Sequence, residues 1–303
     1  MLGGGGFIGL NLCRRLVESG FRVRVLDRQC SFPEALSGAE LHQGDFADAG
    51  SLEAAIEPAS IVFHLVHTTI PQSANLDMAG DLEKNVIPSL RLLDICRKVG
   101  AARIVFVSSA GTIYGCPEEI PTPETAATNP ITAYGISKLA IEKYLALYEH
   151  LHGLDFRVLR VTNPYGPFQV AHRNQGIIAA MLSRALSNQR IEIWGDGSVV
   201  RDFVFVDDLA DAFVAAAVDQ SNHRIFNIGS GQGLSVREII AAIEGQLAVK
   251  LDIDWKPGRA VDVPISIASI GRAGQVLGWR PKTSFEAGLQ RTIAWWRDKM
   301  PPA

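Results

Sequence analysis

The sequence predicts an α/β protein built on a doubly wound parallel sheet, with a smaller α/β domain after it. From Met1 to about Arg160, short apolar runs rich in Val, Ile and Phe alternate with longer segments of helical period, which is the pattern of βαβ units. A glycine-rich turn opens that stretch. After Asn163 prolines and glycines cluster and the alternation becomes less regular, which indicates a second unit.

The elements of the first unit follow from the hydrophobic period. Strands are expected at 21–26, 40–43, 61–65, 103–108 and 156–159, and helices at 7–19, 76–99 and 133–151. Pro88 lies inside the second helix and should kink it or begin a new turn there. Only Met1 and Leu2 precede the glycines, so either the chain starts late or its first strand is a stump.

The second unit is expected to hold a turn at Gly195-Asp196-Gly197 and helices at 207–219, 235–247 and 285–298. We therefore divide the chain into domains 1–162 and 163–303. The segment of about 203–228 is expected to pack back on the first domain.

Composition excludes several classes of protein. Among 303 residues, 29 Lys and Arg face 32 Asp and Glu, a net charge of −3, which argues against a general nucleic-acid binder. The longest stretch without Asp, Glu, Lys or Arg, 58–76, contains histidines and a proline and is not a membrane span. The four cysteines lack metal-ligand spacing and indicate reduced thiols, with no metal site and the cytoplasm as the expected compartment.

The glycine turn is the first candidate site. Gly3, Gly6 and Gly9 stand at three-residue spacing, with Phe7 and Ile8 opening a helix. Glycine lets the backbone turn tightly and approach a pyrophosphate, whose charge then lies at the helix N-terminus. Taken alone, the turn fits a flexible loop equally well.

Two carboxylates extend this candidate site. Asp27 ends the next expected strand, where it can accept both hydroxyls of an adenosine ribose, which favours NAD over NADP. A turn cap at Asp27 stays open, as does a 2′-phosphate beside Arg28. Asp45, before Phe46, could bond an adenine amino group or form an Asx-turn.

Tyr134 and Lys138 stand four residues apart in a helical segment and so share one face. A nearby ammonium, helped by a cationic nicotinamide, would stabilise the Tyr134 phenolate and lower its pKa from about 10. Such a tyrosine is a general base. A Tyr/Lys pair at this spacing is common on exposed helix surfaces and by itself indicates no active site. This pair, however, follows a dinucleotide loop and a strand that ends at Ser108-Ser109.

These residues resemble the extended short-chain dehydrogenase/reductase family, particularly its UDP-sugar 4-epimerase branch. The resemblance covers nearly the whole chain and implies a Rossmann-type NAD-binding domain with a nucleotide-sugar-binding domain behind it. The motifs that carry it occur in the family's order: Gly3–Gly9, Asp27, Gly44-Asp45, Phe63-His64-Leu65, Asn85, Ser108-Ser109, Tyr114-Gly115, Tyr134–Lys138, Asn163-Pro164, Trp194-Gly195, Arg201-Asp202-Phe203 and Arg259–Asp262.

The resemblance implies that Tyr134 takes the sugar hydroxyl proton, that Lys138 holds the nicotinamide ribose and that Asn85 supports both. The family's Ser or Thr four residues before the Tyr-Gly pair is Ala110 here, and Thr112 is the nearest replacement, with Ser109 a weaker one. The segment Leu65-Val66-His67 also departs from the usual small residues. The expected NAD contacts are Gly3, Gly6, Phe7, Ile8, Gly9, Asp27, Asp45, Phe46, Leu65, Ser108, Tyr134 and Lys138.

For the nucleotide-sugar substrate, the resemblance assigns Asn163 to the phosphate or sugar, Arg201 and Arg259 to the diphosphate, and Asp262 to the ribose. Two guanidiniums can bind a diphosphate through forked hydrogen bonds. An intradomain salt bridge is the alternative for each arginine, with Asp202 a partner for Arg201. The remaining substrate contacts expected are Thr112, Trp194 beside uracil, and Ser266, whose small side chain leaves room for an N-acetyl group.

The expected reaction is therefore NAD-dependent inversion at C4 of a UDP-hexose or UDP-N-acetylhexosamine through a 4-keto sugar. A nucleotide-sugar dehydrogenase or reductase, or an NAD-binding sensor without catalysis, remains the alternative. Dehydratase and decarboxylase branches rank lower, because Gly111 and Thr112 stand where those branches place carboxylates. The family also implies a homodimer packed through the helices at 76–99 and 133–151, and a role in polysaccharide biosynthesis.

Overall fold

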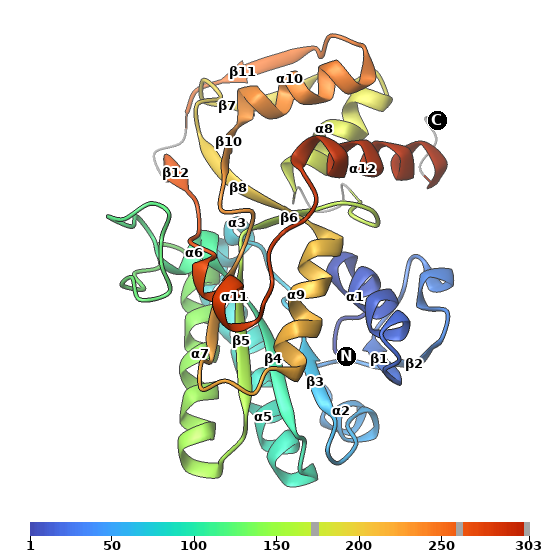
Figure 1. Cartoon of the computed structure of the whole chain (residues 1–303), viewed down its shortest axis with the longest axis vertical. Coiled ribbons are helices and arrows are strands. Elements are labelled where there is room, and N and C mark those ends of the chain that lie inside the picture. Colours follow the sequence, from blue (N-terminus) through green and yellow to red (C-terminus); the bar gives the residue numbers. More distant parts are fainter. Residues whose placement is uncertain (171–175, 259–262, 300–303) are drawn as a thin grey trace.

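The computed structural model describes residues 1–170, 176–258 and 263–299, and a parallel sheet runs through its first half (Figure 1). Residues 1–3 lie in the middle of this sheet, because Leu2 forms parallel bridges to both Leu26 and His64. The strands follow the order β2 (Ala39–Gln43), β1 (Val23–Asp27), residues 1–3, β3 (Ile61–His64), β4 (Arg103–Ser109), β5 (Phe156–Val161) and β9 (Ile225–Ile228). This order is that of a Rossmann-type sheet and confirms the predicted fold class.

Alternating side chains explain why these strands are apolar throughout. Val105 of β4 lies in a core cluster with α1 (Phe7–Glu18) and α9 (Val206–Val218) on one face of the sheet. Its neighbour Phe106 lies in a second cluster on the other face. Successive strand residues point to opposite faces, so a strand covered on both faces needs apolar residues at nearly every position.

The second face of the sheet is covered by α2 (Ala49–Ala55), α5 (Ile87–Val99) and α7 (Ala133–His152). The helix predicted at 76–99 is confirmed except at its start. Helical backbone runs without a break from Met78 to Val99, as α4 (Met78–Asp81), the π-helical turn η2 (Leu82–Val86) and α5, and the separate short helix α3 (Pro71–Leu76) precedes it. Pro88 follows the π-helical turn, so the helical hydrogen bonding changes at the proline where a kink or a new turn was predicted.

The second half of the chain forms its own core above the sheet (Figure 1). The helices α8 (Ile177–Leu186), α10 (Val236–Leu247) and α12 (Phe285–Lys299) pack there. A Ser235–Glu238 capping box starts α10, as its sequence indicates. The strands are β6 (Asn163–Tyr165), β7 (Ile191–Trp194), β8 (Val200–Phe205), β10 (Gly233–Ser235), β11 (Ile253–Lys256) and β12 (Ile265–Ser266).

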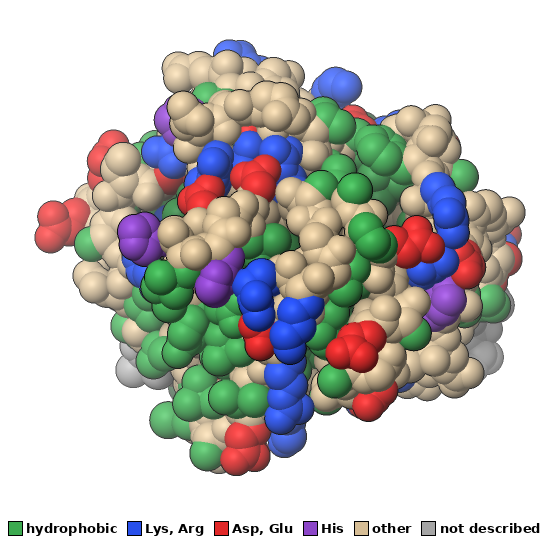
Figure 2. Space-filling model, turned by 90° about the horizontal axis from the view of Figure 1, so that it is seen from below, with side chains coloured by type: hydrophobic (Ala, Val, Ile, Leu, Met, Phe, Trp, Pro, Cys, Tyr) green, Lys and Arg blue, Asp and Glu red, His purple; other side chains and the backbone are tan. Residues whose placement is uncertain are grey.

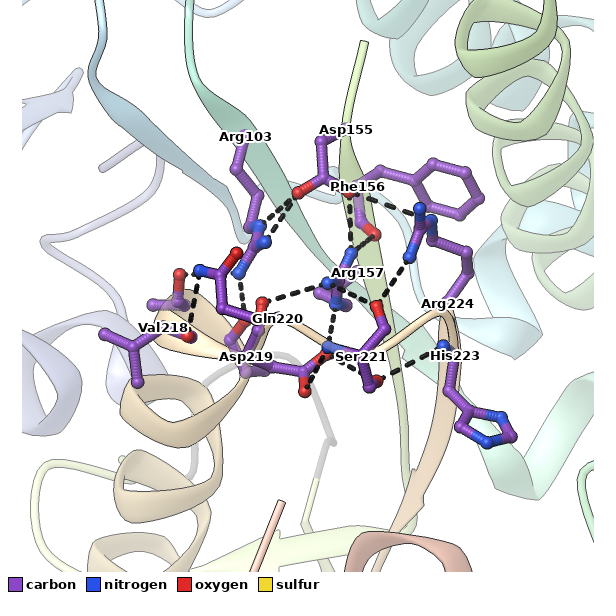
Figure 3. A network of polar contacts seen from close by, with 12 residues as sticks. Arg103, Asp155, Phe156, Arg157, Val218, Asp219, Gln220, Ser221, His223 and Arg224 are labelled. Carbon is purple, nitrogen blue, oxygen red and sulfur yellow. Dashed lines mark hydrogen bonds and ion pairs between the residues drawn. The ribbon is translucent and has the colours of Figure 1, made fainter. Parts of the chain in front are cut away.

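Between β8 and β10 the chain returns to the first sheet, and we call these residues, 206–228, the return segment. The helix α9 packs against α1, and β9 pairs in parallel with β5. Buried arginines anchor this return where β4 and β5 begin (Figure 3). Arg157 binds Asp155 and Asp219, both at 2.7 Å, and Arg103 donates to Asp155 and to the carbonyls of Ala216 and Ala217.

Three short elements complete the described chain: the 3₁₀ turn η1 (Pro33–Leu36), α6 (Ala110–Ile113) and α11 (Gly271–Val276). A search of the described residues finds no helix long and apolar enough to cross a membrane.

Candidate active site

The glycine turn lies where residues 1–3 meet the start of α1. Gly3 has φ +80°, a conformation that favours glycine. A Cβ on Gly9 would lie 2.4 Å from the Gly3 carbonyl oxygen and 2.5 Å from Gly4 Cα, so the helix packs directly on the turn. No side chain caps the helix N-terminus at Gly6, which leaves first-turn amides near Phe7 and Ile8 for an anion.

Asp27 ends β1 beside this turn. Its Oδ2 accepts a hydrogen bond from the Gly5 amide at 2.9 Å, and its Oδ1 accepts one from the Arg28 amide at 2.7 Å. The carboxylate thus acts as a turn cap and also lies at the edge of the glycine turn. The same conformation of Asp27 is therefore compatible with both predicted roles, the turn cap and the acceptor for the ribose hydroxyls.

The other predicted cofactor residues differ in their burial and in their contacts. Asp45 is exposed, and its Oδ1 accepts from the Ala47 amide at 2.8 Å, the geometry of an Asx-turn. Phe46 is buried and packs on His64, with ring centroids 4.8 Å apart. Leu65 is half-buried at the border of the core cluster that contains α1.

Ser108 is buried at the end of β4 and donates to Glu142 Oε1 at 2.5 Å. The same carboxylate binds Arg160 at 2.7 Å. Ser108 therefore belongs to a buried network that joins β4, β5 and α7. This partner of Ser108 was not foreseen from the sequence, because Glu142 and Arg160 lie far from it along the chain.

Tyr134 and Lys138 lie in the first two turns of α7, whose N-terminus is capped by Thr132. Lys138 is buried, and its Nζ donates to the Val107 carbonyl at 2.8 Å and lies 5.7 Å from the centroid of the Tyr134 ring. The expected Tyr/Lys pair is thus formed at the carboxyl end of β4.

Thr112 lies on α6, directly against this helix start. A Cβ on Gly135 would come within 2.7 Å of the Thr112 carbonyl oxygen, so α6 and α7 touch through backbone. The Thr112 hydroxyl is buried and has no hydrogen-bond partner among the described residues. This hydroxyl thus belongs to the element that adjoins the start of α7.

Asn85 lies on the π-helical turn η2, an irregularity often found at functional sites. Its side-chain oxygen accepts from the Thr68 amide at 2.8 Å, and its amide donates to Asp81 Oδ1 at 3.0 Å. The Ser137 hydroxyl also donates to Asp81. Sequence reasoning missed Asp81, although its position one helical turn before Asn85 was a usable signal.

The charges around Tyr134 correct one expectation. Burial, and after it the charge of Asp81, raises the pKa of Tyr134 in the chain by itself. Burial also lowers the pKa of Lys138 to about 7, against the opposing effects of Glu142 and Asp81. In the chain by itself, burial and Asp81 therefore outweigh any stabilisation of the phenolate by Lys138, and the predicted lowering also included a cationic nicotinamide.

On the second domain, Asn163 donates its side-chain amide to the Asp202 carbonyl at 2.8 Å. Ser266 pairs with Arg201 in the register of β12 and β8, and Arg201 Nη1 donates to the Val200 carbonyl at 2.9 Å. The buried Asp202 carboxylate accepts from the Ser230 hydroxyl and amide, both at 2.7 Å. Arg259 and Asp262 lie outside the described residues.

Two cavities border these residues. One is narrow and brings Ala110, Tyr114 and Ser266 into a common lining. The other, of about 430 Å³, opens beside the turn at Gly195, next to Trp194, which is 45% exposed. Arg237 stacks on Trp255 in its wall, 5.0 Å from the ring centroid, and neither residue was predicted because no motif marks them.

Comparison with known proteins places the chain in a family. The model of the "NAD dependent epimerase/dehydratase family" matches residues 1–229. A UDP-glucose 4-epimerase of Mycolicibacterium smegmatis is 35% identical, over 98% of this chain and 97% of that protein. A dTDP-4-dehydro-6-deoxyglucose reductase of Escherichia coli is 30% identical, over 96% of this chain and 95% of the other.

Solved structures agree over nearly the whole length. UDP-glucose 4-epimerase of Thermotoga maritima, with UDP-glucose, superposes with a TM-score of 0.93 at 35% identity, covering 99% of this chain and 98% of that one. The Thermus thermophilus enzyme with NAD gives 0.91 at 32% identity, with coverage of 99% and 98%.

A UDP-N-acetylglucosamine 4-epimerase of Methanobrevibacter ruminantium, in complex with UDP-N-acetylmuramic acid, gives a TM-score of 0.91 at 26% identity, covering 99% of this chain and 97% of that one. The matched residues span the glycine turn, the Tyr134/Lys138 helix and the return strand β9. The chain belongs to the NAD-dependent epimerase/dehydratase family.

Proposed function

We propose that this protein is an NAD-dependent 4-epimerase of UDP-hexoses. The observation that carries the proposal is that the glycine turn with Asp27 and the Tyr134/Lys138 pair lie at the carboxyl ends of strands of one parallel sheet. The chain also matches UDP-glucose 4-epimerases over nearly its whole length. The turn fits NAD because Gly9 packs without a Cβ and the helix N-terminus at Gly6 has no side-chain cap. NAD, when bound, supplies reversible hydride transfer at the sugar C4 carbon.

In the proposed reaction, Tyr134 takes the proton of the C4 hydroxyl, and the Thr112 hydroxyl hydrogen-bonds the same oxygen. Lys138 holds the nicotinamide ribose, and Asn85 fixes the loop at Thr68 beside them. As the C4 hydroxyl proton leaves, C4 would pass hydride to NAD and become the ketone of a 4-keto sugar. The ketone would turn in the site, and return of hydride to its other face, with the proton from Tyr134, would invert C4. No net redox change occurs, so the cofactor is regenerated in each turnover.

For substrate binding we propose Asn163, Trp194, Arg201, Arg259, Asp262 and Ser266. Trp194 would flank uracil, and the two arginines would bind the diphosphate despite the net negative charge of the chain. The cavity beside Gly195, with Arg237 and Trp255 in its wall, is our candidate for the nucleotide end. The small side chain of Ser266 beside Ala110 supports acceptance of N-acetylhexosamines as well.

The function is tested by incubating purified protein with UDP-glucose, UDP-N-acetylglucosamine and their C4 epimers, and following C4 configuration by NMR. We expect inversion without consumption of NAD, and Tyr134→Phe should lower kcat by about a hundred- to ten-thousandfold while NAD stays bound. Full activity in Tyr134→Phe would refute the assignment of the base.

A nucleotide-sugar reductase or dehydrogenase is the second candidate, because the relative from Escherichia coli is a reductase that matches over 96% of this chain. Turnover that depends on added NAD(H) in stoichiometric amounts would favour it. A protein that binds NAD but converts no nucleotide sugar would instead be a sensor.

We also propose a homodimer. The view from below shows hydrophobic side chains gathered on the side where α7 lies (Figures 1 and 2). Large hydrophobic side chains are exposed along two stretches of the chain. They are Leu76, Met78, Leu82 and Ile87 on the segments from α3 to α5, and Ile136, Tyr144, Leu147 and Leu151 on α7. An apolar surface of this extent marks an interaction site, and a second copy would bury both stretches in a bundle of helices.

Sedimentation measures the oligomeric state of the protein directly. Leu147→Glu with Leu151→Glu should give a monomer, whereas Val249→Glu, an equally exposed position in the second domain, should leave the dimer intact. A wild-type monomer would overturn the proposal.

The described cysteines are free thiols, which supports a cytoplasmic site of action. We propose that the enzyme supplies sugar donors for polysaccharide biosynthesis there.

A further inference from the structure

His67, in the loop after β3, contacts the ring of Tyr134. The two rings meet edge to face, with centroids 4.4 Å apart and an interplanar angle of 68°. The His67 side chain is only 6% exposed, so its imidazole occupies space within the site rather than at its rim. A ring in this position restricts how the phenol can rotate.

Asp81 lies against His67. Its Oδ1 is 3.7 Å from His67 Nε2, and its side chain is fully buried. It accepts hydrogen bonds from Ser137, Thr69 and Asn85. His67 makes no hydrogen bond to it at 3.7 Å. Burial raises the pKa of Asp81, but the nearby imidazole and the bonds from Ser137 and Thr69 lower it further. Asp81 is therefore a fixed negative charge near the proposed base.

That charge acts against catalysis unless something moderates it. A carboxylate next to a phenol disfavours the phenolate, and Asp81 is the charged group that raises the pKa of Tyr134 after burial. The proposed base thus has Lys138 to favour its ionisation and Asp81 to oppose it. His67 contacts both Tyr134 and Asp81.

The charge state of His67 suits this position. The titratable groups that face it are Asp81 on α4, Tyr134 and Lys138 on α7, and His64 on β3. Burial, and after it the charge of Lys138, lowers the pKa of His67 to about 4. The imidazole is neutral at pH 7 and can direct one N–H toward Asp81 without placing a second cation beside Lys138.

We propose that His67 is a positioning residue for Tyr134, which holds the phenol ring in place and shields it from the carboxylate of Asp81. The proposal rests on the proposed function, since that function makes Tyr134 the base. It predicts that the effect of His67 on Tyr134 depends on the presence of the Asp81 charge.

The test is a double-mutant cycle read by ultraviolet titration of the Tyr134 phenol in NAD-loaded protein, with Tyr134→Phe subtracted as the blank. His67→Phe keeps an aromatic ring but removes the imidazole nitrogen that lies 3.7 Å from Asp81, and should raise the pKa of Tyr134 by about one unit. Asp81→Asn should lower it. In the Asp81→Asn background, His67→Phe should produce no further shift.

A matched control exists on α7, the helix that carries Tyr134. His152 also packs edge to face on a tyrosine, Tyr148, with centroids 5.4 Å apart, but is exposed far from the site. His152→Phe should leave the titration and kcat unchanged. His67→Gln, which restores a donor without the ring, should return the pKa of Tyr134 toward wild type, and it provides the reading if His67→Phe does not fold.

An unchanged pKa in His67→Phe, or an equal shift with and without Asp81, would overturn the proposal. In the activity arm, His67→Phe should lower kcat for C4 inversion about tenfold with KM for the UDP-sugar unchanged, since His67 contacts the base rather than the substrate. Wild-type protein that inverts no UDP-sugar would defeat the proposed function instead, and the titration would still report on His67.

Discussion

Thr112 carries the hydroxyl that we propose assists the base, in a site where the family resemblance places that group at Ala110. Its Oγ1 is buried without a partner among the described residues, and its backbone is pressed against the start of α7 by Gly135. A buried hydroxyl without a hydrogen bond costs free energy in the folded protein. That cost is recovered when a substrate oxygen binds there.

The variant Thr112→Val keeps the shape of this side chain and removes the hydroxyl. We expect kcat for C4 inversion to fall about a hundredfold, because a hydrogen bond to the reacting oxygen is lost, with no loss of thermal stability. Thr112→Ser is the control and should retain most activity. Wild-type kcat in Thr112→Val would show that another group binds the sugar hydroxyl.

Local spacing explains which site residues could be predicted. Tyr134 and Lys138 are visible in the sequence because four residues fix their relation on a helix. Asp81 and His67 reach Tyr134 from other elements, and no local rule connects them. No pattern in the sequence indicated that burial and Asp81 raise the pKa of Tyr134 in the chain by itself, since both are features of the assembled site.

At the scale of elements, the glycine turn and α1 form one rigid unit. A Cβ added to Gly9 would clash with backbone atoms of Gly3 and Gly4. A Cβ added to Gly6 would meet nothing closer than the Gly3 carbonyl oxygen at 3.5 Å. The two glycines therefore have different reasons for lacking a side chain. Gly9 permits the packing, and Gly6 borders the proposed pyrophosphate site.

Alanine at each position separates these reasons. Gly9→Ala should lower the melting temperature and abolish NAD binding, because backbone atoms at 2.4 Å and 2.5 Å must move apart. Gly6→Ala should melt near the wild-type temperature yet bind NAD more weakly. Calorimetry and NAD titration measure both, and equal melting temperatures for the two variants would contradict this account.

The buried arginines at the start of β4 and β5 set the stability of the return segment. Arg157→Met should lower the free energy of unfolding by about 3–5 kcal/mol, because Asp219, whose side chain is 5% exposed, stays buried without its cation. Arg190 pairs with Asp252 on the surface, each 64% exposed, so Arg190→Met should leave the denaturation midpoint unchanged. Denaturant unfolding compares the two, and matching midpoints would argue against the network.

Strands were easier to predict than helices in this chain. The strands of the sheet are buried on both faces and so show as continuous apolar runs, and β4 and β5 lie within two residues of their expected bounds. The helix around Pro88 was predicted, but its π-helical turn at Leu82–Val86 was not, because that turn keeps a helical hydrophobic period while altering the hydrogen bonding.

At the scale of the whole molecule, the two sequence halves share one sheet. The last strand, β9, follows β8 of the second core in the chain and pairs with β5 of the first. The family model also ends at residue 229, directly after this strand. Cutting the chain at residue 162 would therefore leave β5, buried along its whole length, with an open edge.

A fragment of residues 1–162 should aggregate, since an exposed apolar strand edge is a template for intermolecular pairing. A fragment of residues 1–229 carries α9 and β9 and should stay in solution and bind NAD. Light scattering and NAD titration distinguish them. A monomeric, NAD-binding 1–162 fragment would show that the return segment is dispensable.

The return of β9 also has a consequence during synthesis. A ribosome adds about 5–20 residues per second, so roughly 3–13 seconds separate the completion of β5 from that of β9. During this interval the nascent chain has a long apolar edge, and the arginine that will anchor the return has no Asp219 to bind. Chaperone binding to this intermediate, rather than the rate of folding of the finished chain, would then limit the yield of active protein in a cell.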